Sequence, residues 1–196
     1  MAGTDDAYAV VAVASSAGGI TALFRVLGAL PADLPVPVLV VQHLDPRHKT
    51  VLAELVSRRT ELRVKLATAG ELVEAGTVYI APPNQHLLVE PPGILALSGS
   101  ELVHFVRPSA DLLFESVAGA YGSRAIACVL TGSGSDGATG VSAIKSRGGT
   151  VLVQDPDEAE FQGMPRAAVA TGDADIVVPL EDIADVIRGL VVASSS

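Results

Sequence analysis

Short apolar runs alternate along this chain with segments whose apolar residues recur at helical spacing. The run at residues 8–14, for example, is followed by a Gly-rich turn and then by Ile20, Leu23, Phe24, Leu27 and Leu30. The same order of strand, turn and helix recurs at residues 36–56 and again from residue 125 onward. Such alternation is typical of a mostly parallel sheet with right-handed crossovers. We therefore predict an α/β fold, doubly wound, with helices on both faces of the sheet.

A different pattern interrupts the alternation between about residues 63 and 106. Short strand-like pieces lie there between Gly76 and two Pro-rich turns, Pro82-Pro83-Asn84 and Pro91-Pro92-Gly93. The two pieces that flank Pro91-Pro92-Gly93 predict a β-hairpin insertion near residues 86–97.

Helical periodicity returns at residues 111–121, for which Ser109 is the expected N-cap. No linker, internal repeat or low-complexity segment divides the chain before its terminal serines. We therefore expect a single domain over residues 1–196, with its core at about residues 8–192. Further strands are predicted at 125–131, 150–154 and 176–178, and further helices at 138–146, 165–171 and 180–192.

The composition narrows the classes of partner. The formal net charge is −9, and the basic residues form no cluster, which argues against nucleic acid and against an acidic membrane surface. No run approaches the roughly 18 apolar residues that a membrane span requires, and the acidic start is unlike a signal peptide. The single cysteine, Cys128, lies in an apolar run and is expected to be buried. These features predict a cytoplasmic protein without membrane insertion.

Three polar residues, Ser16, His43 and Asp136, each stand just past the end of an apolar strand. The carboxyl ends of parallel strands share one edge of a sheet, where ligands bind. A nucleophile, a base and an orienting acid are therefore predicted to meet there. Each also has a structural interpretation, because Ser16 or its neighbour Ser15 is a suitable N-cap, and Asp136 is suited to cap the helix that follows Gly137.

The chain has four histidines, and three of them compete with His43 for the role of base. His48 lies in a charged segment and is expected to face solvent. His86 follows the Pro-Pro-Asn turn, and His104 lies in a strand-like segment, 102–106, with no Gly-rich turn beside it. His43 directly follows a buried strand that would carry its imidazole to the sheet edge, so it is the preferred base.

Two Gly-rich loops lie beside these candidates, at residues 14–19 and 130–137. Glycines let backbone amides approach a ligand closely, and the amides near Ala17 and Ser133 are candidate donors to an oxyanion. The chain has no GxSxG elbow, and its order of Ser, His and Asp differs from that of the α/β-hydrolases. A common lipase or esterase is therefore disfavoured.

Six motifs from about Val10 to Leu190 cover nearly the whole chain. They are ASSAGG at 14–19, VQH at 41–43, APPNQHL at 81–87, RPSADLLF at 107–114, LTGSGSDG at 130–137 and GMPRA at 163–167. Together they resemble the catalytic domain of the CheB-type chemotaxis methylesterases. By this resemblance Ser16 is the nucleophile, His43 the base and Asp136 the acid, and the Gly18-Gly19 pair favours Ser16 over Ser15.

The resemblance implies a protein-glutamate methylesterase that acts without a metal or an organic cofactor. Its substrates would be glutamate γ-methyl esters on a chemoreceptor-like protein or on another methylated protein, with glutamine deamidation as a related activity. Family members often have Thr in place of Ala17 and Met in place of Ser133, so the oxyanion loops are expected to differ here.

Better-known family members carry a receiver domain before the catalytic domain. The first predicted strand begins within about ten residues of Met1, which is too little for such a domain. We therefore expect no control by phosphorylation in cis, and a separate regulatory protein in trans is the alternative.

Two other functions fit parts of the pattern. A nucleotide-binding module is suggested by the turn at 14–19, which opens a helix after the first strand, although it retains only the last glycine of G-x-G-x-x-G. A catalytically weak homologue that binds a methylated or helical peptide is suggested by Ala17 and Ser133.

Overall fold

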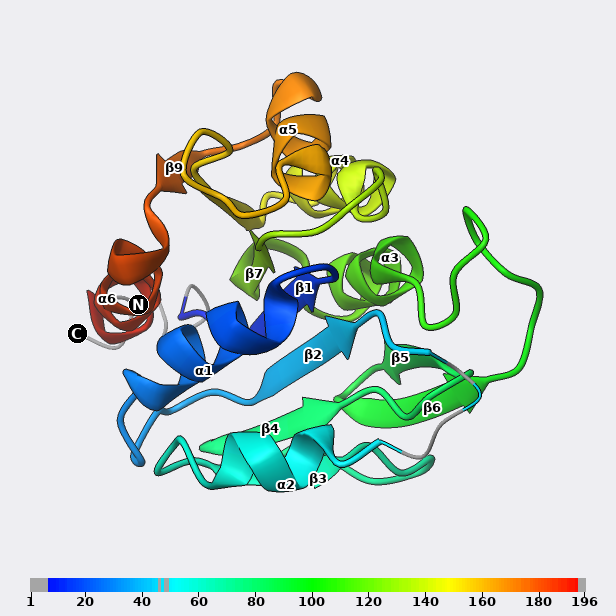
Figure 1. The fold of residues 1–196 in the computed structure, drawn as a ribbon. Helices are drawn as coiled ribbons and strands as arrows, with labels where there is room; N and C mark the ends of the chain where they lie inside the picture. The colour runs from blue at the N-terminus through cyan, green and yellow to red at the C-terminus, as the bar shows by residue number, and fades with distance from the viewer. Residues whose placement is uncertain (1–6, 46, 48–49, 194–196) are drawn as a thin grey trace.

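The computed structural model describes residues 7–45, 47 and 50–193, and these residues form a seven-stranded sheet with a separate hairpin (Figure 1). All pairings in the large sheet are parallel. The direction of winding reverses between β1 and β7, and in such sheets the ligand crevice opens at that point. In order across the sheet, the strands are β3 (Arg63–Leu66), β4 (Thr77–Ile80), β2 (Val38–Gln42), β1 (Val10–Ser15), β7 (Ala125–Val129), β8 (Thr150–Gln154) and β9 (Ile176–Val178).

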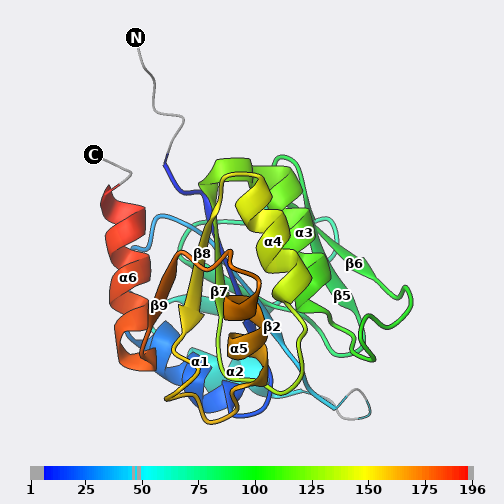
Figure 2. The same ribbon diagram turned by 90° about the horizontal axis from the view of Figure 1, so that it is seen from above.

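Helices cover both faces of this sheet. On one face lie α1 (Gly19–Gly28), α2 (Leu52–Ser57) and α6 (Leu180–Ala193), and on the other lie α3 (Ala110–Tyr121), α4 (Ala138–Ser146) and α5 (Gly163–Ala170). Figure 2 shows α6 and α4 on opposite sides of the sheet. Side chains alternate between the faces, so Val11 and Val13 of β1 pack with α1, whereas Ala12 and Ala14 share a core with α3. The predicted doubly wound α/β fold is confirmed.

The predicted hairpin is also confirmed. Strands β5 (His86–Glu90) and β6 (Ile94–Ser98) pair antiparallel around the Pro91-Pro92-Gly93 turn. Their buried side chains Leu87, Val89 and Leu95 belong to the same core cluster as Phe114 of α3. The hairpin thus covers the α3 side of the molecule and supports the start of that helix.

The segment at residues 102–106, which is strand-like in sequence, forms a turn and not a strand. His104 and Phe105 have φ angles of 48° and 65°, in the left-handed region. Val103 and Val106 exchange backbone hydrogen bonds of 3.1 and 2.9 Å across them, which closes a tight two-residue turn. Turn geometry of this kind ordinarily favours Asn-Gly. The segment has apolar residues in place of such a pair, so its sequence does not indicate the turn.

Two expectations from composition can be compared with the structure. Among the helices formed by the described residues, none combines the length and the apolar character needed to cross a membrane. Cys128 is fully buried in β7, as predicted, and burial raises the pKa of its thiol to about 12. This thiol therefore stays protonated and packs as a small apolar side chain.

Candidate active site

His43 and Asp136 meet at the carboxyl edge of the sheet. Nε2 of His43 lies 2.8 Å from Oδ2 of Asp136, and the two side chains are 13% and 4% exposed. His43 follows β2 and Asp136 lies in the loop after β7, so strand β1 lies between the two strands that carry them. A carboxylate on one ring nitrogen fixes the orientation of an imidazole and stabilises its protonated form. Because Nε2 is occupied, Nδ1 is the nitrogen left to accept a proton.

The carboxylate of Asp136 is held by the first residues of α3. It accepts hydrogen bonds from the backbone amides of Ala110 (2.6 Å) and Asp111 (3.1 Å) and from Ser109 Oγ (3.0 Å). Burial by itself raises the pKa of Asp136, but the hydrogen bond with His43 and those from the two amides outweigh it. The pKa of Asp136 therefore lies below its usual value, and the group is an anion at neutral pH.

Asp136 does not cap the helix that follows it, contrary to the structural interpretation. Gly137 is the N-cap of α4, and the donors at this helix start are satisfied from α3 instead. Asp111 Oδ1 accepts hydrogen bonds from the amides of Gly137 (3.0 Å) and Gly140 (2.8 Å). Each of the two helices is thus capped by a carboxylate from the other segment. Ser109 does occupy the predicted N-cap position of α3, but its hydroxyl donates to Asp136.

Ser15 and Ser16 differ sharply in their surroundings. Ser15 is fully buried, and its Oγ donates a 2.5 Å hydrogen bond to Gln42 Oε1. Ser16 is half-buried in the turn before α1, and its backbone amide donates to the carbonyl of Thr131 (3.1 Å). Within the described part of the chain, no hydrogen bond joins Ser16 Oγ to His43, so their direct contact stays a prediction. The burial of Ser15 leaves Ser16 as the accessible hydroxyl of the pair.

Gln42 connects the serine turn to the histidine, and the sequence reasoning did not identify it. Its Nε2 donates to the carbonyls of Ser16 (2.8 Å) and His43 (3.0 Å), and its Oε1 accepts from Ser15. A Cβ on Gly19 would overlap Gln42 Oε1 and would lie 2.7 Å from Ser15 Cβ, so only glycine fits at the start of α1. The sequence feature that points to Gln42 is its position, as a polar residue at the end of an otherwise apolar strand.

The loop after β7 is clamped by the segment that begins α5. The backbone amide of Gly132 donates to Phe161 (3.0 Å), and its carbonyl accepts from the amide of Met164 (2.9 Å). A Cβ on Gly163 would lie 2.8 Å from the backbone of Gly134, so the two segments are in direct contact. This packing explains the GMPRA motif, because glycine permits the close approach that fixes the loop.

The two candidate oxyanion donors lie on these loops. Ala17 is half-buried and its carbonyl accepts from Thr131 Oγ1 (3.1 Å), whereas Ser133 is exposed. The amide of Gly132 already donates to Phe161, so it is not available to a ligand. The roles of the Ala17 and Ser133 amides stay predictions.

The competing histidines have other environments. His86 is fully buried, and its two ring nitrogens bond to the carbonyl of Glu101 (2.9 Å) and the amide of Ser109 (3.0 Å). His104 lies on the tight turn, with Nε2 3.3 Å from Asp111 Oδ2 and its side chain 56% exposed. The prediction for His48 falls outside the described residues. Of the histidines that are described, His43 is the one that contacts Asp136.

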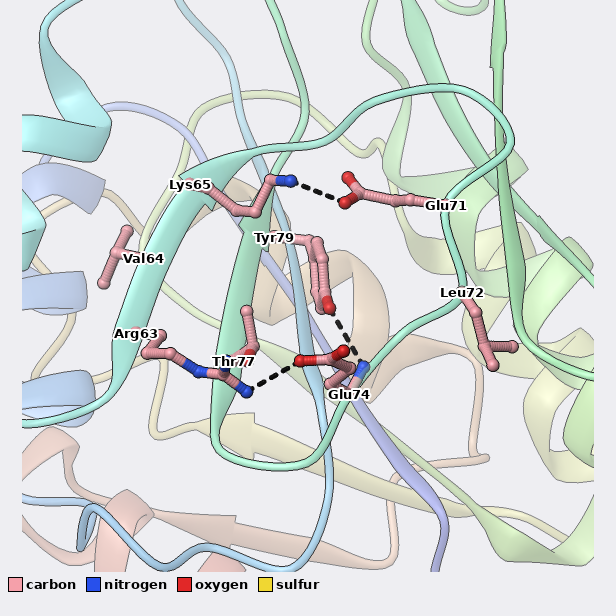
Figure 3. A pocket seen from close by; sticks show the side chains of 8 residues that line it. All are labelled: Arg63, Val64, Lys65, Glu71, Leu72, Glu74, Thr77 and Tyr79. Atoms are coloured by element: carbon pink, nitrogen blue, oxygen red, sulfur yellow. Dashed lines mark hydrogen bonds and ion pairs between the residues drawn. The ribbon is translucent and has the colours of Figure 1, made fainter.

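A cavity of about 690 Å³ lies over β3 and β4, and none of the proposed triad residues lines it (Figure 3). Its charged groups are paired with one another. Arg63 lies 2.8 Å from Glu74, and Lys65 lies 2.6 Å from Glu71. The hydroxyl of Tyr79 accepts from the amide of Glu74 (2.9 Å). The residues that line this cavity include no serine, cysteine or histidine, whereas the sheet edge holds the contact between His43 and Asp136.

Comparison with known proteins gives a consistent result. The sequence matches the family described as CheB methylesterase over residues 11–187. A putative protein-glutamate methylesterase/protein-glutamine glutaminase of Leptospira interrogans is 39% identical, over 91% of this chain and 92% of that protein. The protein-glutamate methylesterase FrzG of Myxococcus xanthus is 42% identical over 90% of this chain, which spans 53% of that protein.

The fold agrees with the sequence comparison. The crystal structure of the Thermotoga maritima CheB methylesterase catalytic domain superposes with a TM-score of 0.90 and 36% sequence identity, covering 93% of this chain and 98% of that one. Similarity of this extent, in both sequence and fold, shows that the chain belongs to the CheB methylesterase family.

Proposed function

We propose that this protein is a serine hydrolase that removes methyl esters from the γ-carboxyl groups of glutamates in proteins, with glutamine deamidation as a related activity. The observation that carries the proposal is the 2.8 Å contact between His43 and Asp136 beside the Ser16 turn. The names of the relatives support this choice of substrate. The anionic state of Asp136 supports the role of an acid that orients and stabilises a protonated base.

The first half of the reaction follows from these positions. Ser16 Oγ attacks the ester carbonyl while Nδ1 of His43 takes the hydroxyl proton, and Asp136 stabilises the resulting imidazolium. The amides of Ala17 and Ser133 donate to the tetrahedral oxyanion. The C–O bond to the methoxy group then breaks, His43 returns the proton, and methanol leaves an acyl group on Ser16.

The second half repeats the cycle with water. His43 takes a proton from the water that attacks the acyl carbonyl, and it gives this proton to Ser16 Oγ as the bond to serine breaks. The product is a glutamate side chain and a regenerated serine. With glutamine in place of the ester, the same steps release ammonia.

A carboxylate near the serine turn argues against the nucleotide-binding alternative. A Cβ on Gly18 would lie 2.8 Å from Glu160 Oε2, which places that carboxylate against the start of α1. Phosphate groups bind at helix N-termini because the charge there is partly positive, and a carboxylate beside them repels phosphate. Binding of a methylated peptide without hydrolysis remains the competing function, and a turnover assay separates the two.

The test is methanol release from a peptide that contains γ-methyl-glutamate, with ammonia release from the glutamine peptide measured in parallel. Ser16→Ala is expected to abolish both activities. Ser142→Ala is the matched control, because Ser142 lies on α4 and its Oγ donates a hydrogen bond to Asp173 (2.6 Å), not to a residue of the proposed triad. Hydrolysis that survives unchanged in Ser16→Ala would overturn the proposal, and so would peptide binding by the wild type without turnover.

The wider setting is also proposed. We infer a cytoplasmic protein whose residues 1–196 form one domain, acting on a methylated chemoreceptor-like protein or another methyl-esterified protein, and regulated by a separate protein in trans. The buried, unpaired Cys128 fits a reducing compartment. Methanol release from a radiolabelled methylated receptor, compared with another methylated protein, tests the choice of partner.

A further inference from the structure

An apolar groove of about 260 Å³ adjoins the segments that carry Ser16 and His43. Leu44, one residue after His43, lines the groove, and so does Ile20, which follows the Ser16 turn at the start of α1. The rest of its apolar lining comes from the start of α2, at Val51, Leu52 and Leu55. The groove thus lies on the α1 and α2 side, and two of its lining residues belong to the segments that carry Ser16 and His43.

The polar residues of the lining are engaged with their own segment. Asp45 pairs with Arg47, with Oδ1 3.0 Å from Nε and Oδ2 2.7 Å from an Nη atom. Thr50 Oγ1 accepts a 3.0 Å hydrogen bond from the amide of Leu52. The surface that remains for a ligand is therefore mainly aliphatic.

The aliphatic side chains of the groove are unusually open to solvent. Val51 is 54% exposed, Leu55 38% and Ile20 36%. A single exposed valine such as Val192, also at 54%, needs no explanation. A cluster beside a reaction centre is different, because grouped exposed apolar side chains mark binding surfaces.

The size of the groove limits what it binds. Pockets for drug-sized ligands and cofactors usually measure about 300–1,000 Å³, and this groove is smaller. It suits one or two aliphatic side chains. The esterified glutamate side chain itself is short and uncharged, so the polypeptide that carries it must lie across the mouth of the site, with neighbouring residues over the flanking surface.

We propose that this groove binds an apolar side chain of the substrate protein, a few residues from the methylated glutamate. The inference rests on the proposed function, because it is the substrate polypeptide that continues from Ser16 and His43 onto the groove. Contacts of this kind add affinity without touching the reacting atoms, so they lower KM and leave kcat unchanged.

The experiment uses a set of γ-methyl-glutamyl peptides in which leucine is moved through the four positions on each side of the ester, with serine elsewhere. In the wild type, leucine at one or more positions is expected to raise kcat/KM about tenfold over the all-serine peptide, the effect of partly burying one such side chain. Val51→Ser and Leu55→Gln should remove this preference through KM. Val192→Ser, an equally exposed valine far along α6, should retain it.

The two substitutions are chosen so that the variants should still fold. Val51 is the N-cap of α2, where serine is a favoured residue, and glutamine keeps the helix propensity of Leu55. Thermal unfolding checks both. If a variant does unfold more easily, the ratio of kcat/KM between leucine and serine peptides still reports on the groove, because both substrates meet the same folded enzyme.

The outcomes separate the groove from the catalytic proposal. Equal kcat/KM for every peptide in the wild type would overturn the groove inference while hydrolysis still stands. Turnover of none of them would overturn the proposed function. In that case, the binding of the same peptides, measured by fluorescence anisotropy, tests the groove. Tighter binding of a leucine peptide that is lost in Val51→Ser would support the groove inference, and equal binding of all peptides would contradict it. Competition by a regulatory protein in place of the leucine effect would assign the groove to that protein and overturn the inference.

Discussion

The starts of α3 and α4 are each capped by a buried aspartate, but the pKa values of the two aspartates shift in opposite directions. Asp136 precedes α4 and bonds to the first amides of α3, whereas Asp111 in the first turn of α3 bonds to the first amides of α4. Both side chains are 4% exposed. The pKa of Asp136 is lowered, yet the pKa of Asp111 is raised.

The partners beyond the helix amides explain the difference. Burial is the main cause that raises the pKa of Asp111, and the negative charge of Asp136 raises it further. The hydrogen bonds from Gly140 and Gly137 and the nearby His104 lower this pKa, but by less. Asp136 gains a hydrogen bond with the sequestered His43, while His104 sits on an exposed turn. A capped helix start holds a carboxylate in place, but the imidazole partner distinguishes Asp136, the acid of the proposed triad, from Asp111.

The largest expected effect comes from Asp136→Asn. The substitution keeps the shape but removes the charge that stabilises the imidazolium, so kcat for methanol release should fall by about 10⁴-fold. Steady-state kinetics with a γ-methyl-glutamyl peptide measure it, and circular dichroism confirms folding. A kcat within about tenfold of the wild-type value would mean that Asp136, like Asp111, is only a cap.

Asp111→Ala should affect stability far more than chemistry. It leaves the buried amides of Gly137 and Gly140 without an acceptor, which should lower the free energy of unfolding by about 1–3 kcal/mol. Urea denaturation measures this loss. The kcat of the folded variant should stay within about tenfold of the wild-type value, because Asp111 has no contact with His43 among the described residues. A loss as large as that of Asp136→Asn would remove the distinction between the two carboxylates.

The two carboxylates should also give stability opposite dependences on pH. The pKa of Asp136 is lower in the folded state, so its contribution is complete above the ordinary aspartate pKa of about 3.9 and is lost as the pH falls through the folded value. The pKa of Asp111 is higher in the folded state, so its protonation favours folding as the pH falls toward about 3.9. Urea denaturation of the wild type, Asp136→Asn and Asp111→Asn from pH 7 to pH 3 tests both signs.

In that series the stability difference between wild type and Asp136→Asn should shrink toward acid. As the pH falls over the same range, the free energy of unfolding of the wild type should increase relative to that of Asp111→Asn. Parallel curves for the two variants would contradict the assigned pKa shifts.

The smallest effect is expected at His104. Because its imidazole is exposed, His104→Asn should change the free energy of unfolding by less than about 1 kcal/mol. Asparagine also suits the left-handed turn, and kcat should change by less than about twofold. A large loss of activity, measured in the same peptide assay, would show that His104 acts on the site through Asp111.

The sequence predicted the architecture well because the relevant signals are local. The buried strand 150–154 and the helix 138–146 have the bounds that their apolar patterns indicated. The turn at His104 and Phe105 was missed because its left-handed conformation depends on surrounding contacts more than on its side chains. Burial of Ser15 against Gln42 joins residues 27 positions apart, which periodicity does not register.

For the site, strand ends placed Ser16, His43 and Asp136 at one edge, and the structure brings His43 and Asp136 into contact. The exchange of caps between α3 and α4 could not be predicted, because an aspartate before a helix ordinarily caps its own helix. Only the packing of the two helix starts against each other makes the exchange favourable.

The central claim is that Ser16, activated by His43 and Asp136, is the nucleophile. The most direct measurement is labelling with a serine-directed fluorophosphonate, followed by tandem mass spectrometry to locate the adduct. We expect one adduct, on Ser16 Oγ, that is lost in His43→Ala and absent from Ser15, whose hydroxyl is buried against Gln42. An adduct on Ser15 or on another residue, or none on a protein that releases methanol, would contradict the account.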